Sequence, residues 1–324
     1  MAQPNELQKK FTLRTAKSSD ADEQAALLAG WNQNYVQLSR GRFDGALTES
    51  CLDGVRLFVE STSQSLLQGG MLQNDVIAVG VPIKMTGPAV FCGTKVHRPA
   101  VFVFSGSEGF EFRSPPGLMM SGIVVPRAAV LELLSDPDRE RITPLLAHAH
   151  ITCVDDARMN AARHLNQAIF RLLASGQPVA PAQLHDLRIN VLSHVAELIL
   201  GCSAPEPPLR RRHRWRIVAE VRRIALESAC GPTSIAEVCR AVGVSRRTLQ
   251  YCFEETLGLT PLEFLRTVRL HGARRLLRSA PSVTDAATQY GFWHLSYFSH
   301  DYRTLFGELP SQTHRRYHAD SQRL

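Results

Sequence analysis

The chain has 324 residues, of which 44% are hydrophobic and 21% charged, so its length and composition allow two globular cores. No run approaches the roughly 18 apolar residues of a membrane span, and no apolar secretory segment opens the sequence, so we expect a cytoplasmic protein with no membrane partner. The formal charge of +7 is concentrated in residues 205–324, which hold 19 Arg, no Lys and 11 acidic residues; this asymmetry is typical of a near-neutral sensor joined to a module that binds a polyanion.

The first half of the chain is expected to begin with a helix and to continue as β-structure. Apolar residues recur at helical spacing over residues 20–38, where Ala25, Leu28 and Tyr35 would share one face. From residue 43 to residue 125 the apolar runs are short, rich in β-branched and aromatic side chains, and separated by Gly, Pro, Asn or Asp, which predicts a sandwich or a small barrel. The expected strands are residues 46–49, 55–60, 65–68, 76–79, 101–104, 110–113 and 119–125.

Three helices are expected after these strands, over residues 126–134, 157–175 and 181–200. The last of them has two apolar stripes, one through Val191 and the other through Val195. A helix that covers only its own sheet needs one stripe. We therefore expect residues 181–200 to form a homodimer interface; the alternative is that both stripes are buried inside one subunit.

A change in composition separates two domains. Three prolines fall between positions 205 and 208 and an arginine run follows, so residues 201–214 are expected to be a stiff linker. This places a regulatory domain for sensing or dimerisation at residues 1–200 and a second domain at residues 215–324, whose first helix is expected over residues 215–229.

The second domain contains two segments with a helix-turn-helix pattern. In residues 235–253 a short amphipathic helix ends at Gly243, which allows a tight corner, and Ser245 stands at the N-cap of a second helix. That second helix has an apolar back, and its front carries long polar side chains three or four residues apart. A helix of this kind fits the major groove of DNA.

Residues 283–298 repeat the pattern around Gly291, and a helix over residues 262–278 joins the two segments. Pro261 begins this connecting helix, and five arginines load it with charge. A helix of that length spans about 25 Å, which suits two recognition helices in successive major grooves about 34 Å apart. One such motif alone is weak evidence for DNA binding, but two motifs joined by a basic helix are a strong signal.

Together these segments resemble the DNA-binding domain of AraC/XylS-family transcriptional regulators. The resemblance rests on VSRRTLQ at 244–250, RLHGARRLL at 269–277 and YGFWHLSYFSHDYRTLFGELPS at 290–311. It implies an all-α domain with two helix-turn-helix motifs after a cupin-like barrel with flanking helices, and hence an α+β protein. It also implies a transcriptional regulator, an activator or a repressor according to where its site lies relative to the promoter, with double-stranded promoter DNA as partner and RNA polymerase as a further candidate partner.

The exposed polar faces of the two recognition helices give the expected DNA contacts. In the first motif we expect base-edge contacts from Arg247, Gln250 and Tyr251, and phosphate contacts from Ser245, Arg246 and Thr248. In the second motif they are His294, Leu295, Ser296, Ser299, His300 and Arg303. Arg pairs with guanine and Gln with adenine, each worth ~1–3 kcal/mol of discrimination. Family members often have Arg where His300 stands, so we expect the second motif to read sequence less strictly; the alternative is that His300 is an ordinary surface residue.

The N-terminal half carries a second resemblance, to the branch that contains ethanolamine-utilisation operon regulators and related virulence and quorum-sensing regulators. It rests on residues 31–38, 41–45 and 58–60, together with residues 291–295 of the second domain. This branch implies a small-molecule effector such as ethanolamine or adenosylcobalamin, rather than a resident cofactor. An amine would need a carboxylate and aromatic rings. The candidates are Glu49, Glu60, Glu111, Phe58, Phe102 and Phe110. The alternative is a regulator without an effector, which controls virulence or quorum-sensing genes through its abundance or a protein partner.

No set of residues predicts an enzyme. His148 and His150 have the spacing of metal ligands but lie outside the strands on which a cupin would hold a metal. Residues 106–109 lack the glycines of a phosphate loop, and Ser121 lacks the flanks of a nucleophile elbow. Seven cysteines without a C-x-x-C pair fit a role as small apolar side chains. We expect no catalytic or metal site; an architectural or RNA-binding protein remains the alternative use of the basic domain.

Overall fold

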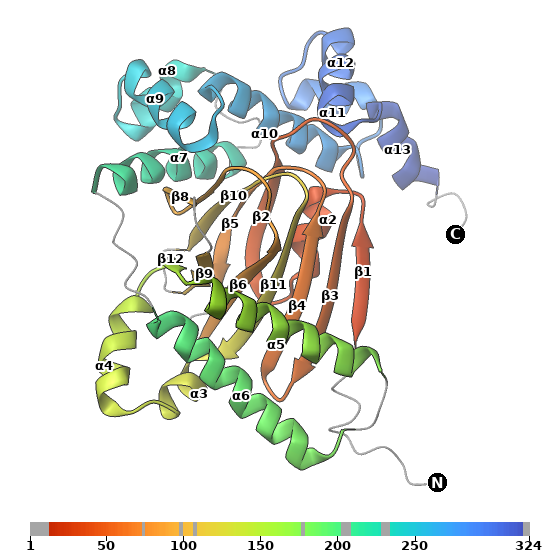
Figure 1. Ribbon diagram of the computed structural model, residues 1–324. Coiled ribbons are helices and arrows are strands. Elements are labelled where there is room, and N and C mark those ends of the chain that lie inside the picture. The colour runs from red at the N-terminus through yellow and green to blue at the C-terminus, as the bar shows by residue number, and fades with distance from the viewer. Residues whose placement is uncertain are drawn as a thin grey trace. The chain divides into compact units, whose positions relative to one another are not determined.

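The computed structural model describes residues 13–72, 75–96, 100–105, 109–175, 179–201, 209–227 and 234–319. The chain divides into two compact units, drawn in Figure 1. Unit 1 comprises Met1–Tyr35, Asp44–Ser63 and Gln68–Glu206, and unit 2 comprises Val36–Phe43, Gln64–Leu67 and Pro207–Leu324. Half of the expected linker, residues 202–208, lies outside the described residues.

Two sheets form most of unit 1. The larger has the order β1 (Arg14–Ser18), β3 (Gly45–Leu52), β4 (Val55–Thr62), β11 (Leu118–Pro126), β6 (Val76–Lys84), β9 (Ala100–Phe104) and β12 (His150–Cys153). The smaller has the order β2 (Trp31–Gln37), β5 (Leu66–Leu72), β10 (Phe110–Ser114), β7 (Ala89–Phe91) and β8 (Thr94–Val96). Every strand expected from the sequence is present. Within the described residues neither ladder closes on itself, so the sheets do not form a closed barrel.

The expected helix over residues 20–38 is wrong beyond Leu27. Helix α2 (Ala21–Leu27) begins after Asp20, whose carboxylate accepts a hydrogen bond from the N–H of Asp22 at 2.8 Å. The chain then turns at Gly30, with φ +79°, and continues as β2. Residues four apart share one face in a strand as well as in a helix, so the spacing from Trp31 to Tyr35 did not distinguish the two structures.

Aromatic side chains fill the space between the two sheets. The ring of Trp31 lies edge-on to Phe104 and Phe110, with centroids 5.2 and 5.6 Å apart. Phe91 of the smaller sheet lies 5.3 Å from Phe102 of the larger one. These residues belong to one buried apolar cluster, so the inner faces of the sheets form a core of unit 1.

Glu60 is a carboxylate buried beside this aromatic core, and it is 5% exposed. Its Oε1 accepts hydrogen bonds from the Tyr35 hydroxyl and from Gln24 Nε2, both at 3.0 Å. Burial raises the pKa of Glu60 to about 6, although these two hydrogen bonds act in the opposite direction. Phe58 lies two residues earlier on the same side of β4 and belongs to the aromatic core.

The other acidic candidates for an amine site lie elsewhere in unit 1. Glu49 forms an ion pair with Arg14 at 3.5 Å. Glu111 alternates with Phe110 and Phe112, which both face the aromatic core, so its side chain leaves the opposite face of β10. Glu60 is therefore the acid of the expected set that joins the interior aromatic residues.

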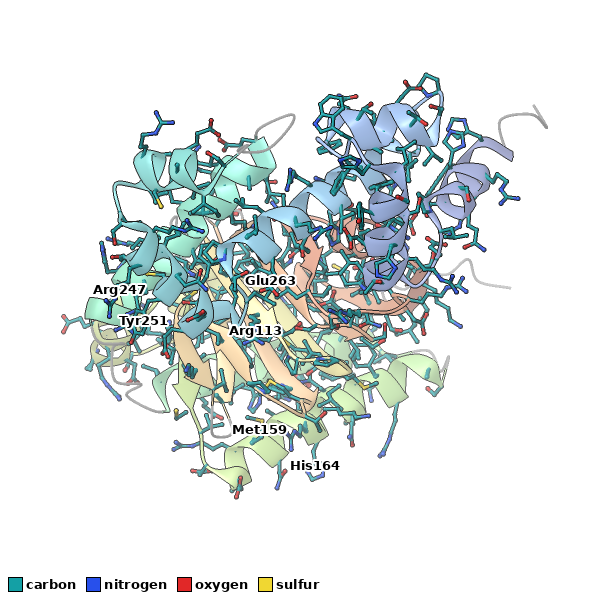
Figure 2. All side chains as sticks on the ribbon, turned by 90° about the horizontal axis from the view of Figure 1, so that it is seen from above. Arg113, Met159, His164, Arg247, Tyr251 and Glu263 are labelled. Carbon is teal, nitrogen blue, oxygen red and sulfur yellow. The ribbon has the colours of Figure 1, made fainter. Side chains whose placement is uncertain are left out.

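Four further helices belong to unit 1: α3 (Arg127–Glu132), α4 (Asp136–Leu145), α5 (Asp156–Ala174) and α6 (Pro181–Leu200), with β12 between α4 and α5. Figure 1 draws α5 and α6 across the larger sheet, and a second apolar cluster joins them to its strands; Met159 of α5, labelled in Figure 2, is 2% exposed there. Val191 and Val195, one from each stripe of α6, are both fully buried. Both stripes thus pack inside unit 1, which removes the sequence argument for a dimer through this helix; the homodimer itself stays a prediction.

Unit 2 is helical apart from its two short early segments. Its helices are α7 (Leu209–Glu227), α8 (Ile235–Val242), α9 (Arg246–Leu257), α10 (Pro261–Leu276), α11 (Val283–Gln289), α12 (Leu295–Phe306) and α13 (Pro310–Ala319). Helix α7 begins at Leu209 rather than at residue 215, so the arginine run continues the helix instead of forming part of a linker. Arginine favours a helix, and the last of the three helix-breaking prolines, at position 208, comes before the arginine run.

The connecting helix α10 takes part in two separate cores. At its N-terminal end, Phe264 packs on Phe253 of α9 with ring centroids 5.3 Å apart. At its C-terminal end, Leu277 belongs to the cluster that contains Phe298 and Tyr302 of α12. Helix α10 therefore links the α8–α9 pair and the α11–α12 pair, between which Figure 1 draws it, and each pair has its own core.

Candidate nucleic-acid interface

Local hydrogen bonds set the direction of the first recognition helix. Helix α8 starts with a capping box, in which Ser234 Oγ accepts from the N–H of Glu237 at 3.2 Å and the carboxylate of Glu237 accepts from the N–H of Ser234 at 3.1 Å. Gly243 ends α8 in the left-handed conformation, with φ +67°. Ser245 Oγ then accepts from the N–H of Thr248 at 3.1 Å and caps α9.

Helix α9 has a buried back and an exposed front. Leu249 and Phe253 are fully buried, whereas Arg246 and Arg247 are exposed and Tyr251 is 48% exposed. Arg247 and Tyr251 lie one turn apart and project from the same side of the helix (Figure 2). The exposed front therefore combines two guanidinium groups with an aromatic ring, on the side away from the core.

Two of the expected base contacts already have partners inside unit 2. Gln250 Nε2 donates to Glu254 Oε1 at 2.6 Å, and the guanidinium carbon of Arg214 lies 4.6 Å from the centre of the Tyr251 ring. An adenine edge would have to replace Glu254 as the partner of Gln250. No hydrogen bond or ion pair recorded for the described residues holds Arg247, which leaves its guanidinium available for a guanine.

The second motif repeats this backbone plan with a different helix start. Ser282 Oγ accepts from the N–H of Asp285 at 3.2 Å and caps α11, and Gly291 has φ +75°. Helix α12 begins after His294, whose side chain makes no capping hydrogen bond. Phe298 is fully buried and anchors α12 to the second core. The second recognition helix is thus held by its packed back rather than by a side-chain cap.

The expected DNA contacts of the second motif lie at the start of α12 and along its outer side. The exposed ones are His294, Leu295, Ser296, His300 and Arg303, and Ser299 is half-buried. Between Gly291 and Tyr302 the sequence has no Lys or Arg. The first turns of α12 therefore present hydroxyl, imidazole and apolar groups, and the first guanidinium appears at Arg303.

Two aromatic residues of this segment are strongly exposed. The side chains of Trp293 and Tyr297 are 75% and 68% exposed, against 39% for Leu295. Neither is among the expected contacts. Their position relative to Phe298 could have indicated exposure, since helical spacing places Tyr297 about 100° away from that buried residue.

Three arginines of α10 have partners in the second motif. Arg266 forms an ion pair with Asp301. The guanidinium carbon of Arg269 lies 5.5 Å from the centre of the Phe292 ring. Arg274 is only 4% exposed. These three arginines of α10 therefore contact residues of the second motif, and of the three Arg274 is the buried one.

A buried polar network lies under the second motif. Arg274 Nη1 lies 2.8 Å from Glu308 Oε1 and donates to the Tyr302 hydroxyl at 3.1 Å. The Tyr302 hydroxyl donates to Thr313 Oγ1 at 2.8 Å, and the Thr313 hydroxyl donates to Glu308 Oε1 at 2.9 Å. Arg316 also forms an ion pair with Glu308. Burial raises the pKa of Tyr302 to about 12, so its hydroxyl remains a donor at neutral pH.

Unit 2 also includes the two short segments from the first part of the chain. Val36 and Leu67 are buried in the core of the first motif. The backbone N–H of Gln37 donates to His271 Nε2 of α10 at 2.9 Å, and its side-chain amide donates to the carbonyl of Leu305 in α12 at 2.7 Å. These segments therefore contact helices of both motifs.

The geometry around His148 and His150 gives no support to a metal site there. Across the part of the chain that the structure describes, no group of three or more His, Cys, Asp or Glu side chains is placed to hold a metal ion. His150 lies on β12, and its Nδ1 is 3.0 Å from the carbonyl oxygen of His148.

No helix among the described residues is long and apolar enough to cross a membrane.

Comparisons with known proteins match the segment that carries both motifs. Residues 238–316 match the model of a helix-turn-helix domain family. The chain is 42% identical over 85 residues to a probable thc operon regulatory protein of Rhodococcus erythropolis, and 37% identical over 84 residues to XylDLEGF operon transcriptional activator 2 of Pseudomonas putida. Each match covers 25% of this chain, and the chain spans 26% and 54% of the length of these two relatives.

Two solved structures resemble this chain, one over about a third of its length and the other over most of it. A probable AraC family transcriptional regulator from Rhodopseudomonas palustris is 34% identical, with a TM-score of 0.30, over 32% of this chain and 97% of that one. The AraC-like transcriptional activator CuxR is 12% identical, with a TM-score of 0.42, over 83% of this chain and 96% of that one.

Proposed function

Because this chain belongs to the AraC/XylS family through its helix-turn-helix domain, we propose that it is a sequence-specific regulator of transcription that binds promoter DNA. The single observation that carries the proposal is the pair of recognition helices, α9 and α12, each exposed on one side and each packed on its own core, at the two ends of α10. A connecting helix of this length suits two successive major grooves. The proposed base contacts are those expected in the sequence, with Arg247 first among them.

The decisive experiment selects a binding site from a pool of random duplexes with the full chain. Enrichment of one site with two separate conserved blocks supports the proposal, and a pool that stays random contradicts it. Footprinting on the selected duplex should show a protected region of about two helical turns. Binding to RNA in preference to duplex DNA would favour the RNA-binding alternative.

Variants then separate base reading from phosphate contact. Arg247→Ala and Gln250→Ala should weaken binding to the selected site about 10–100-fold, while binding to a scrambled duplex changes little. Arg315→Ala serves as a control, because this arginine is exposed on α13, outside both recognition helices. An equal loss on both duplexes for Arg247→Ala would assign that side chain to phosphates.

We also propose that unit 1 is a regulatory module of the cupin-like type, and that it senses a small amine such as ethanolamine. The support is Glu60, a carboxylate that is buried at the edge of an aromatic interior. A carboxylate beside aromatic rings is the chemistry that holds an ammonium group. An effector bound only by the native state raises the melting temperature.

The test is a thermal-shift measurement with ethanolamine and with adenosylcobalamin on the full chain. A shift that disappears in the Glu60→Gln variant supports an amine effector at this residue. No shift with either compound would favour the alternative regulator, which has no effector and responds to its own abundance or to a protein partner. A homodimer and contact with RNA polymerase complete the proposal; light scattering of the full chain and transcription with purified polymerase would test them.

A further inference from the structure

Trp293 and Tyr297 form an exposed aromatic pair at the start of α12. Trp293 lies in the turn directly before α12, and Tyr297 lies in its first turn. Trp293 takes part in none of the ring contacts recorded for the described residues, and Tyr297 has one, with His294, at 6.2 Å between ring centroids. With Leu295, three exposed large apolar side chains fall within five residues, and clustered exposed apolar surface marks an interaction site. Because Trp and Tyr combine a broad apolar face with a polar edge, they suit such a surface.

The place of the aromatic pair points to the major groove. The N-terminal residues of a recognition helix are the ones that contact base edges. Phe298 is fully buried and fixes the inner side of α12, so that Tyr297 and His300 lie away from the core. Trp293 and Tyr297 therefore belong to the same surface as the expected base contacts Ser296 and His300.

The chemistry of the pair indicates which bases it meets. A guanine is read best by a guanidinium or an ammonium group, and the first turns of α12 carry neither. The apolar group that the major groove displays is the 5-methyl group of thymine. An aromatic ring packed on that methyl group excludes water from both surfaces. Helix α9 differs, since Arg246 and Arg247 open it.

We propose that Trp293 and Tyr297 pack against thymine methyl groups in the major groove, so that the second motif selects A·T pairs by apolar contact. The inference rests on the proposed function, since it names how one recognition helix reads the site. It predicts that the half-site of α12 is rich in A·T pairs and that its recognition depends on methyl groups more than on donors.

The test replaces thymine by deoxyuridine, which removes the methyl group and leaves base pairing unchanged. The duplex is the site selected by the full chain. The half-site whose protection is lost in Arg247→Ala belongs to α9, and the other belongs to α12. Removing methyl groups from the α12 half-site should weaken binding about fourfold for each contacted methyl, and the same change in the α9 half-site should have a smaller effect.

The variants Trp293→Ala and Tyr297→Ala should bind the thymine duplex more weakly and should no longer distinguish it from the deoxyuridine duplex. Leu262→Ala is the matched control, because Leu262 is 61% exposed on α10, outside the recognition helices, and should retain the full distinction. Unchanged circular dichroism confirms that each variant is folded.

Three results would overturn the inference. One is equal binding of the wild-type chain to the two duplexes. Another is a methyl effect that persists in both aromatic variants. The third is a loss of transcription in these variants without a loss of DNA affinity, which would assign the aromatic pair to a protein partner. In each case the selected site is still bound, so the regulator proposal stands; failure to select any site would instead contradict the proposed function.

Discussion

The two helix-turn-helix motifs of unit 2 share a backbone plan and differ in the chemistry of their recognition helices. Each turns at a glycine with positive φ, Gly243 in the first and Gly291 in the second. Helix α9 is capped by a serine and opens with two arginines, whereas α12 lacks a side-chain cap and opens with exposed aromatic and imidazole groups. We therefore propose that the two motifs read DNA in different ways, one through charged hydrogen bonds and one through apolar contact.

The cores beneath the two motifs differ as well. The first core consists of apolar side chains around Phe253 and Phe264. The second adds a buried ion pair between Arg274 and Glu308. Breaking a buried pair leaves an uncompensated charge, so the second motif depends on a single contact more than the first does.

The largest expected effect is that of Glu308→Ala. This change leaves Arg274 buried without its carboxylate and should destabilise the second motif by about 3–5 kcal/mol. Hydrogen exchange of the full chain should accelerate in α12 and α13 and stay slow in α9. Glu254→Ala, on the exposed side of α9, is the control and should leave both regions unchanged. Uniform acceleration across unit 2 would mean that the two motifs unfold together.

Glu60 differs from Glu308 in that its hydrogen-bond partners, Tyr35 and Gln24, are neutral. Glu60 has no guanidinium beside it in the contacts described above, and its pKa is raised to about 6 from an ordinary value of 4.5. Since the folded state prefers the protonated acid, the stability that this group contributes is present below pH 4.5 and is lost as the pH rises through 6. Glu60→Gln should therefore raise the free energy of unfolding by about 2 kcal/mol at pH 7.5 and change it little at pH 4.

Urea denaturation at the two pH values measures this difference. The amide keeps an oxygen that can accept from Tyr35 and Gln24, so the variant tests the charge rather than the hydrogen bonds. A variant that is less stable at pH 7.5 would show that the carboxylate is held by a favourable interaction. Glu308→Gln should behave in the opposite way and destabilise the chain at pH 7.5.

The helix caps give a smaller difference. Ser245→Ala removes the acceptor for the N–H of Thr248 and should cost about 1 kcal/mol. His294→Ser supplies the missing cap of α12 and should gain a similar amount. Hydrogen exchange of the first turn of each helix checks both. Equal exchange of the two helix starts in the wild-type chain would contradict this part of the comparison.

The smallest expected effect concerns salt. Arg246→Ala should reduce the slope of log K against log salt concentration by about 0.9, as for one lost phosphate contact. His300→Ala should leave the slope unchanged, since the proposed role of this residue is at base edges. Fluorescence anisotropy with the selected duplex at several salt concentrations measures both. A similar reduction in both variants would show that the second motif also relies on phosphates.

Local sequence signals were enough to predict the corner and the cap of the first helix-turn-helix motif. Gly243 and Ser245 specify a left-handed corner and a cap through interactions within a few residues of each other, and the structure has both. The alternation of apolar residues likewise indicated seven strands, β3 to β6 and β9 to β11, whereas β1, β2, β7, β8 and β12 were not expected. These features could be predicted because their energies depend on neighbours that are close in the chain.

Contacts between distant residues decided the rest. The spacing from Trp31 to Tyr35 fits a helix and a strand equally, and only pairing with other strands selects β2. The burial of both stripes of α6, and of Arg274 beside Glu308, depends on partners from other elements. The exposure of Trp293 follows in the same way, because an aromatic residue is buried only where the rest of the fold supplies a surface to cover it.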